Sequence, residues 1–145
     1  MEEEVKVIPP IHDMTIKPEY FYLVKSGSKK FEVRTNDSRR RAMHKDDLIR
    51  LVNEDPENPE VLWLKIVDKL EFPTFTELYD SFEDKEPVGF KGRTTESIVN
   101  ELRRFYTEEK ERETGVVAIE VELTDDPFLE KKPITRRLTP IKRTY

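Results

Sequence analysis

The chain of 145 residues contains no cysteine, which excludes disulfide bonds, thiolate metal ligands and cysteine nucleophiles. It has no apolar run of about 18 residues, so no membrane-spanning helix is expected. Its four glycines are scattered and form no phosphate-binding loop. The histidines, His12 and His44, lack metal-ligand spacing with any acidic cluster. We therefore expect neither a metal nor a cofactor.

The composition is polar but still typical of a globular protein, with 39% charged and 35% hydrophobic residues. The length favours one domain with one substantial core. The first residues, Met1 to Glu4, are acidic and lack the apolar stretch of a secretory leader. We therefore expect a cytoplasmic protein.

Charge is distributed unevenly along the chain. The whole chain carries −5, yet segment 25–45 has eight basic and two acidic residues, and segment 130–145 has six basic and one acidic. Two basic segments on an acidic body can guide a phosphate backbone to one face, although such runs are equally compatible with solvated loops. The run Arg39, Arg40 and Arg41 supplies the best phosphate contacts, because guanidinium groups bind phosphate in a bidentate way.

Hydrophobic patterning divides the chain into an N-terminal arm (1–10), one domain (11–124) and a basic C-terminal extension (125–145). Strands are predicted at 12–16, 31–35, 48–52, 61–72 and 117–123, and the fourth is long enough to need a β-bulge. Helices are predicted at 18–25, from Thr74, and over 95–111, with a loop or bend at 39–45. This order favours an α+β fold, a small mixed β-barrel or pseudo-barrel with about three peripheral helices.

The most informative stretch surrounds the strand at 31–35. Alternation along a strand places Glu32 and Arg34 on one face and Phe31 and Val33 on the other. Lys29 follows the glycine turn just before this strand. The apolar pair is expected to enter a core, and the three charged residues to floor a cleft for an anionic or base-like ligand.

Several of these pieces resemble an ASCH domain, a member of the PUA-like superfamily. The matching residues span about 11–123 and are His12, Pro18 to Phe21, Ser26 to Lys29, Phe31 to Arg34, Asn36-Asp37, Asp47, Phe75 to Leu78, Tyr106 and Gly115 to Ile119. The family usually has Gly-Asp where this chain has Asp46-Asp47. The resemblance implies a small β-barrel with a polar cleft for RNA or nucleotide-like ligands, here binding through Lys29, Glu32, Arg34, Asn36 and Asp37.

The resemblance also leaves an enzymatic alternative open. Some bacterial members resemble acetylcytidine amidohydrolases, which use a lysine, a threonine and a helical glutamate. Here Lys29 matches the lysine, Glu32 stands at the threonine position, and Glu96 is the nearest helical acid. Further alternatives are a ribonuclease, or a module in which segment 130–145 docks on a protein partner.

Overall fold

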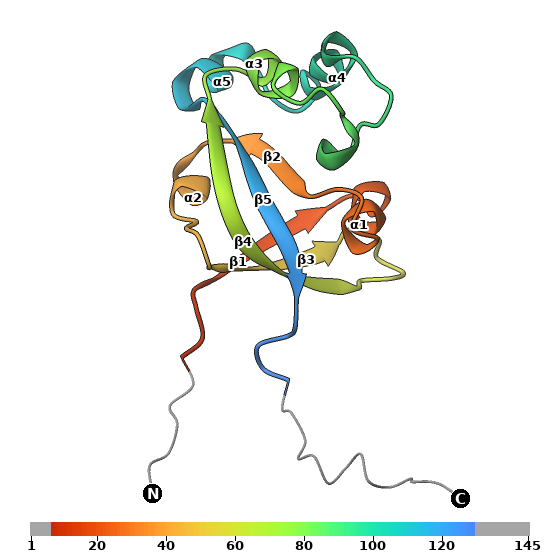
Figure 1. Ribbon diagram of the computed structural model, residues 1–145, viewed down its shortest axis with the longest axis vertical. Helices are drawn as coiled ribbons and strands as arrows, with labels where there is room; N and C mark the ends of the chain where they lie inside the picture. The colour runs from red at the N-terminus through yellow and green to blue at the C-terminus, as the bar shows by residue number, and fades with distance from the viewer. Residues whose placement is uncertain (1–6, 130–145) are drawn as a thin grey trace, which may run out of the picture.

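The computed structural model describes residues 7–129, in which five strands form one mixed sheet that curls into a half-barrel (Figure 1). The strands are β1 (Ile11–Ile16), β2 (Phe31–Thr35), β3 (Leu48–Asn53), β4 (Val61–Phe72) and β5 (Val116–Thr124). The helices are α1 (Pro18–Lys25), α2 (Ser38–Arg41), α3 (Phe75–Asp80), α4 (Thr95–Leu102) and α5 (Glu108–Thr114), with a short 3-10 helix η1 (Glu86–Val88).

The strand order in the sheet is β1-β3-β4-β5-β2, so β1 and β2 are the two edge strands. The β1–β3 pairing is parallel and the other three are antiparallel. The predicted hairpin of β3 and β4 is confirmed, and β4 carries the predicted bulge between Ile66 and Asp68. The bulge bends this long strand, which lets one sheet wrap around a core.

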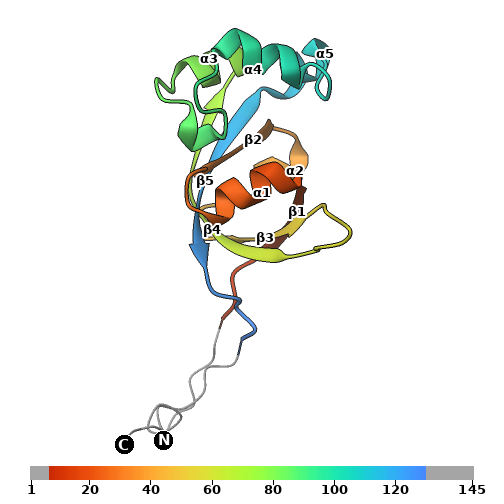
Figure 2. The same cartoon turned by 90° about the vertical axis from the view of Figure 1, so that its right-hand side faces the viewer.

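Strand β5 separates two hydrophobic cores because its side chains alternate between the two faces of the sheet. Val117, Ile119 and Val121 belong to the barrel core, which α1 closes with Phe21 and Val24. On the opposite face, Val116 and Ala118 belong to a second core built with α3, η1 and α4. In both ribbon views α3, α4 and α5 gather at one end of the molecule, while α1 lies across the barrel (Figures 1 and 2).

One helix prediction and one loop prediction differ from the structure. The single helix expected over 95–111 is two helices, since α4 ends at Leu102 and Thr107 caps α5 by accepting a hydrogen bond from the Lys110 amide at 3.0 Å. The loop expected at 39–45 contains α2, whose N-cap is Asp37. A short polar side chain that accepts an amide hydrogen bond explains both helix starts.

Asp46, which stands where the family usually has glycine, adopts a backbone conformation that glycine favours. Asp46 adopts a left-handed conformation with φ 75°, the only positive φ among the described non-glycine residues. Aspartate tolerates this region better than most residues. Its amide donates to the Ile66 carbonyl at 2.8 Å, which fixes the turn before β3.

These elements make an α+β pseudo-barrel, as the strand and helix order predicted. The helices number five in residues 7–129, against about three expected. No helix in this part of the chain is both long and apolar enough to cross a membrane. Segment 1–6 of the arm and the basic segment 130–145 lie outside the described residues.

Candidate functional site

A cleft of about 390 Å³ opens between the edges of the half-barrel and the helical end of the molecule. It is lined from the end of β1, the start of α1, the turn before β2, β2 itself, the segment around η1, and the end of α4 with the residues after it. Lys29, Glu32 and Arg34 all line this cleft. The structure therefore brings together the three charged residues singled out around the first glycine turn.

Lys29 lies at the floor of the cleft with 6% of its surface exposed. Its ammonium group donates to the Phe31 carbonyl and to the Glu32 carboxylate. Burial lowers the pKa of Lys29, an effect that the Glu32 charge partly offsets. The lysine is held by the turn at Gly27, after which its amide donates to the Leu23 carbonyl of α1 at 3.0 Å.

Glu32 is the most deeply buried charged residue of the three, with 3% of its surface exposed. In the β2–β5 register it lies opposite Ile119, so its side chain shares the face of the barrel core, whereas Phe31 and Val33 pack against the second core. Although burial alone raises the pKa of Glu32, the charges of Lys29 and Arg34 hold it below its usual range. A buried carboxylate with two cationic partners stays ionised.

Arg34 joins the two edge strands of the sheet. Its Nη2 atom donates to the Glu32 carboxylate and to the Thr15 carbonyl of β1, both at 3.1 Å. An edge strand presents unpaired carbonyls, and this guanidinium satisfies one of them. The cleft consequently lies at the seam where the half-barrel is closed by a side chain and not by backbone pairing.

Gly89 packs closely against the side chain of Lys29. A Cβ atom at this position would lie 2.9 Å from the Cε of Lys29, and the residue has φ 91°. Both facts favour glycine, since left-handed backbone and close packing are each costly for other residues. The preceding η1 segment is fixed to β2 because the Lys30 amide donates to the Pro87 carbonyl at 2.7 Å.

Aromatic side chains form one wall of the cleft. The Phe90 ring meets Tyr20 edge-on at 5.7 Å and Tyr79 at 5.9 Å between ring centroids. Burial and the nearby Glu32 charge raise the pKa of Tyr79. Phe105 stands at the rim with 56% of its surface exposed, and the Lys17 ammonium lies 4.7 Å from its ring centroid.

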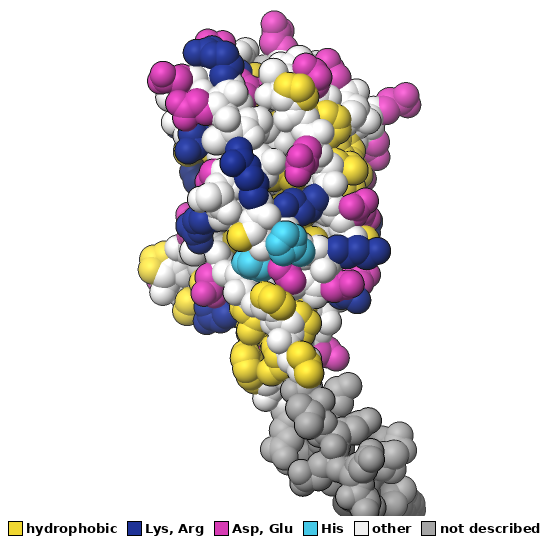
Figure 3. Space-filling view, turned by 90° about the vertical axis from the view of Figure 1, so that its left-hand side faces the viewer, with side chains coloured by type: hydrophobic (Ala, Val, Ile, Leu, Met, Phe, Trp, Pro, Cys, Tyr) yellow, Lys and Arg dark blue, Asp and Glu magenta, His cyan; other side chains and the backbone are white. Residues whose placement is uncertain are grey.

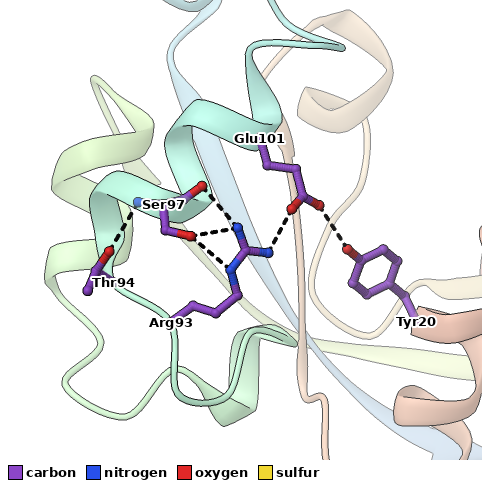
Figure 4. Close-up of polar contacts among 5 residues, drawn as sticks. All are labelled: Tyr20, Arg93, Thr94, Ser97 and Glu101. Carbon is purple, nitrogen blue, oxygen red and sulfur yellow. Dashed lines mark hydrogen bonds and ion pairs between the residues drawn. The ribbon is translucent and has the colours of Figure 1, made fainter.

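A polar network links α4 to α1 along this wall (Figure 4). Glu101 accepts from Arg93 Nη1 at 2.7 Å and from the Tyr20 hydroxyl at 3.3 Å. Arg93 also donates to Ser97 through Nε and Nη2. Burial and the Glu101 charge raise the pKa of Tyr20 to about 12. The hydroxyl therefore stays protonated at neutral pH and acts as a hydrogen-bond donor.

Charges of opposite sign balance across the cleft. The charged residues that line it are Lys17, Lys29, Arg34 and Arg104 on the cationic side, and Glu19, Glu32, Glu54 and Glu101 on the anionic side. A cleft with this balance does not attract a polyanion by itself. Its aromatic wall and fixed polar floor suit a planar, uncharged ligand with both hydrogen-bond donors and acceptors.

Glu96, Asn36 and Asp37 were predicted as site residues but do not line the cleft, and the arginines of the basic run do not line it either. Glu96 is exposed in the first turn of α4, whereas Glu101 of the same helix lines the cleft. Asn36 is buried, and Asp37 caps α2 by accepting from the Arg40 amide at 3.1 Å. Neither of these two lines the cleft.

The basic run has two exposed members and one buried member. Arg39 and Arg41 are exposed, and Arg39 donates to the Asp13 carbonyl of β1 at 3.3 Å. Arg40, predicted with its two neighbours to contact phosphate, has only 9% of its surface exposed. The short helix α2 turns one of three consecutive side chains inward.

Several lining residues escaped the sequence reasoning. Phe90, Glu101 and Arg104 are far along the chain from Lys29 and reach it through tertiary packing. Among the described residues, no three His, Asp or Glu side chains are grouped closely enough to hold a metal ion.

The fold and this cleft define a small α+β pseudo-barrel with a polar cleft at its seam. The family model of the ASCH domain matches residues 14–125, and the chain belongs to that family. The crystal structure of the hypothetical protein PH0355 has 33% sequence identity and a TM-score of 0.67, with 79% of this chain and 99% of that one covered.

A second solved structure is also similar to this chain in sequence and in fold. The solution NMR structure of protein PF0455 from Pyrococcus furiosus has 30% identity and a TM-score of 0.60, covering 80% of this chain and 99% of that one. No curated protein matches the chain. The comparisons therefore establish the family and the fold.

Proposed function

We propose that this protein binds RNA, or a nucleoside-like ligand, by lodging an unstacked base in the cleft above Lys29, Glu32 and Arg34. Membership of the ASCH family, broadly suggested to be an RNA-binding domain, supports this proposal. The observation that carries it is the buried network of these three residues beneath an aromatic wall. Single-stranded RNA is commonly read in this way, by stacking and by polar contacts to base edges.

The floor of the cleft is suited to a base edge because its polar groups are fixed before a ligand arrives. Glu32 is held by both neighbours, and the Arg34 Nη2 atom is already committed to Glu32 and Thr15. The remaining Arg34 donors are available for a carbonyl or ring nitrogen of a base. Pre-organisation of this kind lowers the entropic cost of binding.

Phe105 offers a test that leaves the floor intact. We expect Phe105→Ala to weaken binding of a short single-stranded RNA of mixed sequence by about 5- to 150-fold, as for a lost stacking contact. Fluorescence anisotropy with a dye-labelled strand measures this. Phe128→Ala is the matched control, because Phe128 is 65% exposed and does not line the cleft. Equal losses in the two variants, or no RNA binding by the unaltered protein, would contradict the proposal.

A second candidate function is hydrolysis of an acyl group from an acetylcytidine-like nucleoside. The lowered pKa of the buried Lys29 amine favours it, since a general base must be able to give up its proton before it can accept one. Water would add to the acyl carbon, the C–N bond would break, and acetate and cytidine would leave. Glu101 replaces Glu96 as the helical acid that lines the cleft.

Incubation with N4-acetylcytidine, followed by chromatography for cytidine, tests this candidate. Activity should disappear in Lys29→Ala and persist in Lys30→Ala, which changes the neighbouring lysine outside the floor. Release of cytidine by Lys29→Ala at the original rate would exclude this mechanism. Absence of activity in the unaltered protein would leave the binding function as the sole candidate.

A further inference from the structure

Arg40 is buried without the partners that a buried guanidinium ordinarily has. Its Nε atom is inaccessible to solvent and has no hydrogen-bond partner, and no side-chain hydrogen bond of Arg40 is found within residues 7–129. The nearest carboxylate oxygen, Asp37 Oδ1, is 3.7 Å from Nη1, beyond hydrogen-bond distance, and it accepts from the Arg40 amide instead. Buried cations normally have a counter-ion and satisfied donors, and Arg40 lacks side-chain hydrogen bonds within residues 7–129.

The surroundings of Arg40 are cationic as well as poor in hydrogen bonds. Burial lowers the pKa of Arg40 and the Arg34 charge lowers it further, whereas Asp37 opposes this with an effect larger than that of the more weakly acting Arg39. Arg40 thus has like charges in its neighbourhood and one carboxylate oxygen at 3.7 Å. An anion bound beside Arg40 would offset these like charges and accept from its unsatisfied donors.

This cluster adjoins the cleft. Arg34 lines the cleft, and Tyr106, which also lines it, interacts electrostatically with both Arg34 and Arg40. Asn36 Oδ1, at the end of β2, is a second buried polar atom without a partner in the same short segment. Figure 3 views the side of the molecule on which α2 lies in Figure 1, and Lys and Arg side chains are interspersed with Asp and Glu on that face.

We propose that Arg40, with Arg34 and Arg39 beside it, binds one phosphate group next to the cleft. The cleft itself is charge-balanced and suits an uncharged base, so a phosphate that accompanies the base needs a cationic site outside it. The anion site stands on the geometry of Arg40 alone. Its assignment to a phosphate of RNA rests on the proposed function.

The test uses inorganic phosphate and the full chain, so that it does not depend on RNA binding. In a ¹H–¹⁵N correlation spectrum, the Nε–H signal of Arg40 and the amide signals of α2 should shift in a saturable way as phosphate is added. Sodium chloride at matched ionic strength should not reproduce the shifts. Shifts that grow without saturation, or that chloride reproduces, would overturn the proposal, as would an unmoved Arg40 signal that instead shows a bond to buried water.

Two variants make the assignment specific. Arg40→Met keeps an apolar stem and should abolish the saturable shifts of the α2 amides. Arg41→Met removes an exposed charge from the same helix and should weaken phosphate binding only about twofold. Equal losses in the two variants would mean diffuse attraction and would refute a built site. If Arg40→Met fails to fold, the unaltered protein's Arg40 signal still decides the matter.

The outcome for RNA separates this inference from the proposed function. Phosphate binding at Arg40 without nucleoside binding in the cleft would retain the anion site and reject the proposed function. Nucleoside binding without phosphate binding would do the reverse. If both hold, adenosine monophosphate should bind more tightly than adenosine in the unaltered protein, and Arg40→Met should remove that difference.

Discussion

At the floor of the cleft, the Glu32 carboxylate is held by Lys29 and Arg34, whereas a few residues further along the chain the Arg40 guanidinium is buried with one distant carboxylate. At the first site the Glu32 carboxylate is hydrogen-bonded to both of its cationic partners. At the second site Arg40 has no side-chain hydrogen bond within the described residues. This difference separates charges that are paired within the fold from a charge whose Nε atom has no hydrogen-bond partner in the described residues, and we take the second as the candidate for binding an anion.

The largest expected effect is at the completed site. Glu32→Ala would leave Lys29 and Arg34 buried together without a counter-ion, and we expect the free energy of unfolding to fall by about 3–5 kcal/mol. Urea titration followed by circular dichroism measures this. Glu122→Ala, at an exposed position on β5, is the control and should change stability by less than about 0.5 kcal/mol. Similar effects in both variants would remove the distinction.

The pairing of Glu32 with Lys29 and Arg34 also makes the free energy of unfolding fall at acidic pH. The pKa of Glu32 is lowered in the folded protein, so as the pH falls the unfolded chain is protonated at this residue before the folded chain is. The stability contributed by this pairing is complete above the unfolded pKa of about 4.3 and is lost as pH falls through the lower folded value. In Glu32→Gln this component should be missing. Stability curves of the two proteins that run parallel on acidification would contradict the pairing.

A smaller effect is expected where the backbone presses on Lys29. Gly89→Ala must strain a left-handed residue and push the lysine from its place, at a cost of about 1–3 kcal/mol. Gly92→Ala is matched, since Gly92 has φ 77° but nothing within 4 Å of its added Cβ atom. The additional loss of unfolding free energy in Gly89→Ala, compared with Gly92→Ala, measures the cost of displacing the Lys29 side chain. Equal losses would show that backbone strain alone explains Gly89.

The smallest change in stability is expected at the incomplete site. Arg40→Met removes a buried charge that has no side-chain hydrogen bond, and similar apolar replacements of buried charge are often neutral or stabilising. We expect the free energy of unfolding to stay within about 1 kcal/mol of the original or to rise. Thermal unfolding without phosphate measures it. A loss as large as that of Glu32→Ala would show that Arg40 has a structural partner and that the two sites are alike.

The charged floor could be predicted from the sequence because its parts are close in the chain. Lys29, Glu32 and Arg34 occupy one turn and one strand, and strand alternation alone placed the last two on one face. The burial of Glu32 on the barrel side was not predictable in this way. It follows from the pairing of β2 with β5, whose residues are more than 80 positions further along the chain.

The walls of the cleft were missed for the same reason. Glu101 and Phe90 reach the floor only because α4 and η1 pack on the second core, which no local pattern specifies. The break between α4 and α5 did carry a local signal, the N-cap residue Thr107, but apolar spacing across it was taken as one helix. The burial of Arg40 was not predicted, because a run of three arginines gives no sign of which one turns inward.

The most direct test of the account is a ¹H–¹⁵N titration of the full chain with each of the common ribonucleosides. The account predicts that at least one of them shifts amide signals of β2, of Gly89 and Phe90, and of the residues that follow α4, while signals of the β3–β4 turn at 55–60, which does not line the cleft, stay comparatively still. Shifts confined to that turn, or no saturable shift with any nucleoside, would contradict the claim that the buried charges at the seam form the floor of a base-binding cleft.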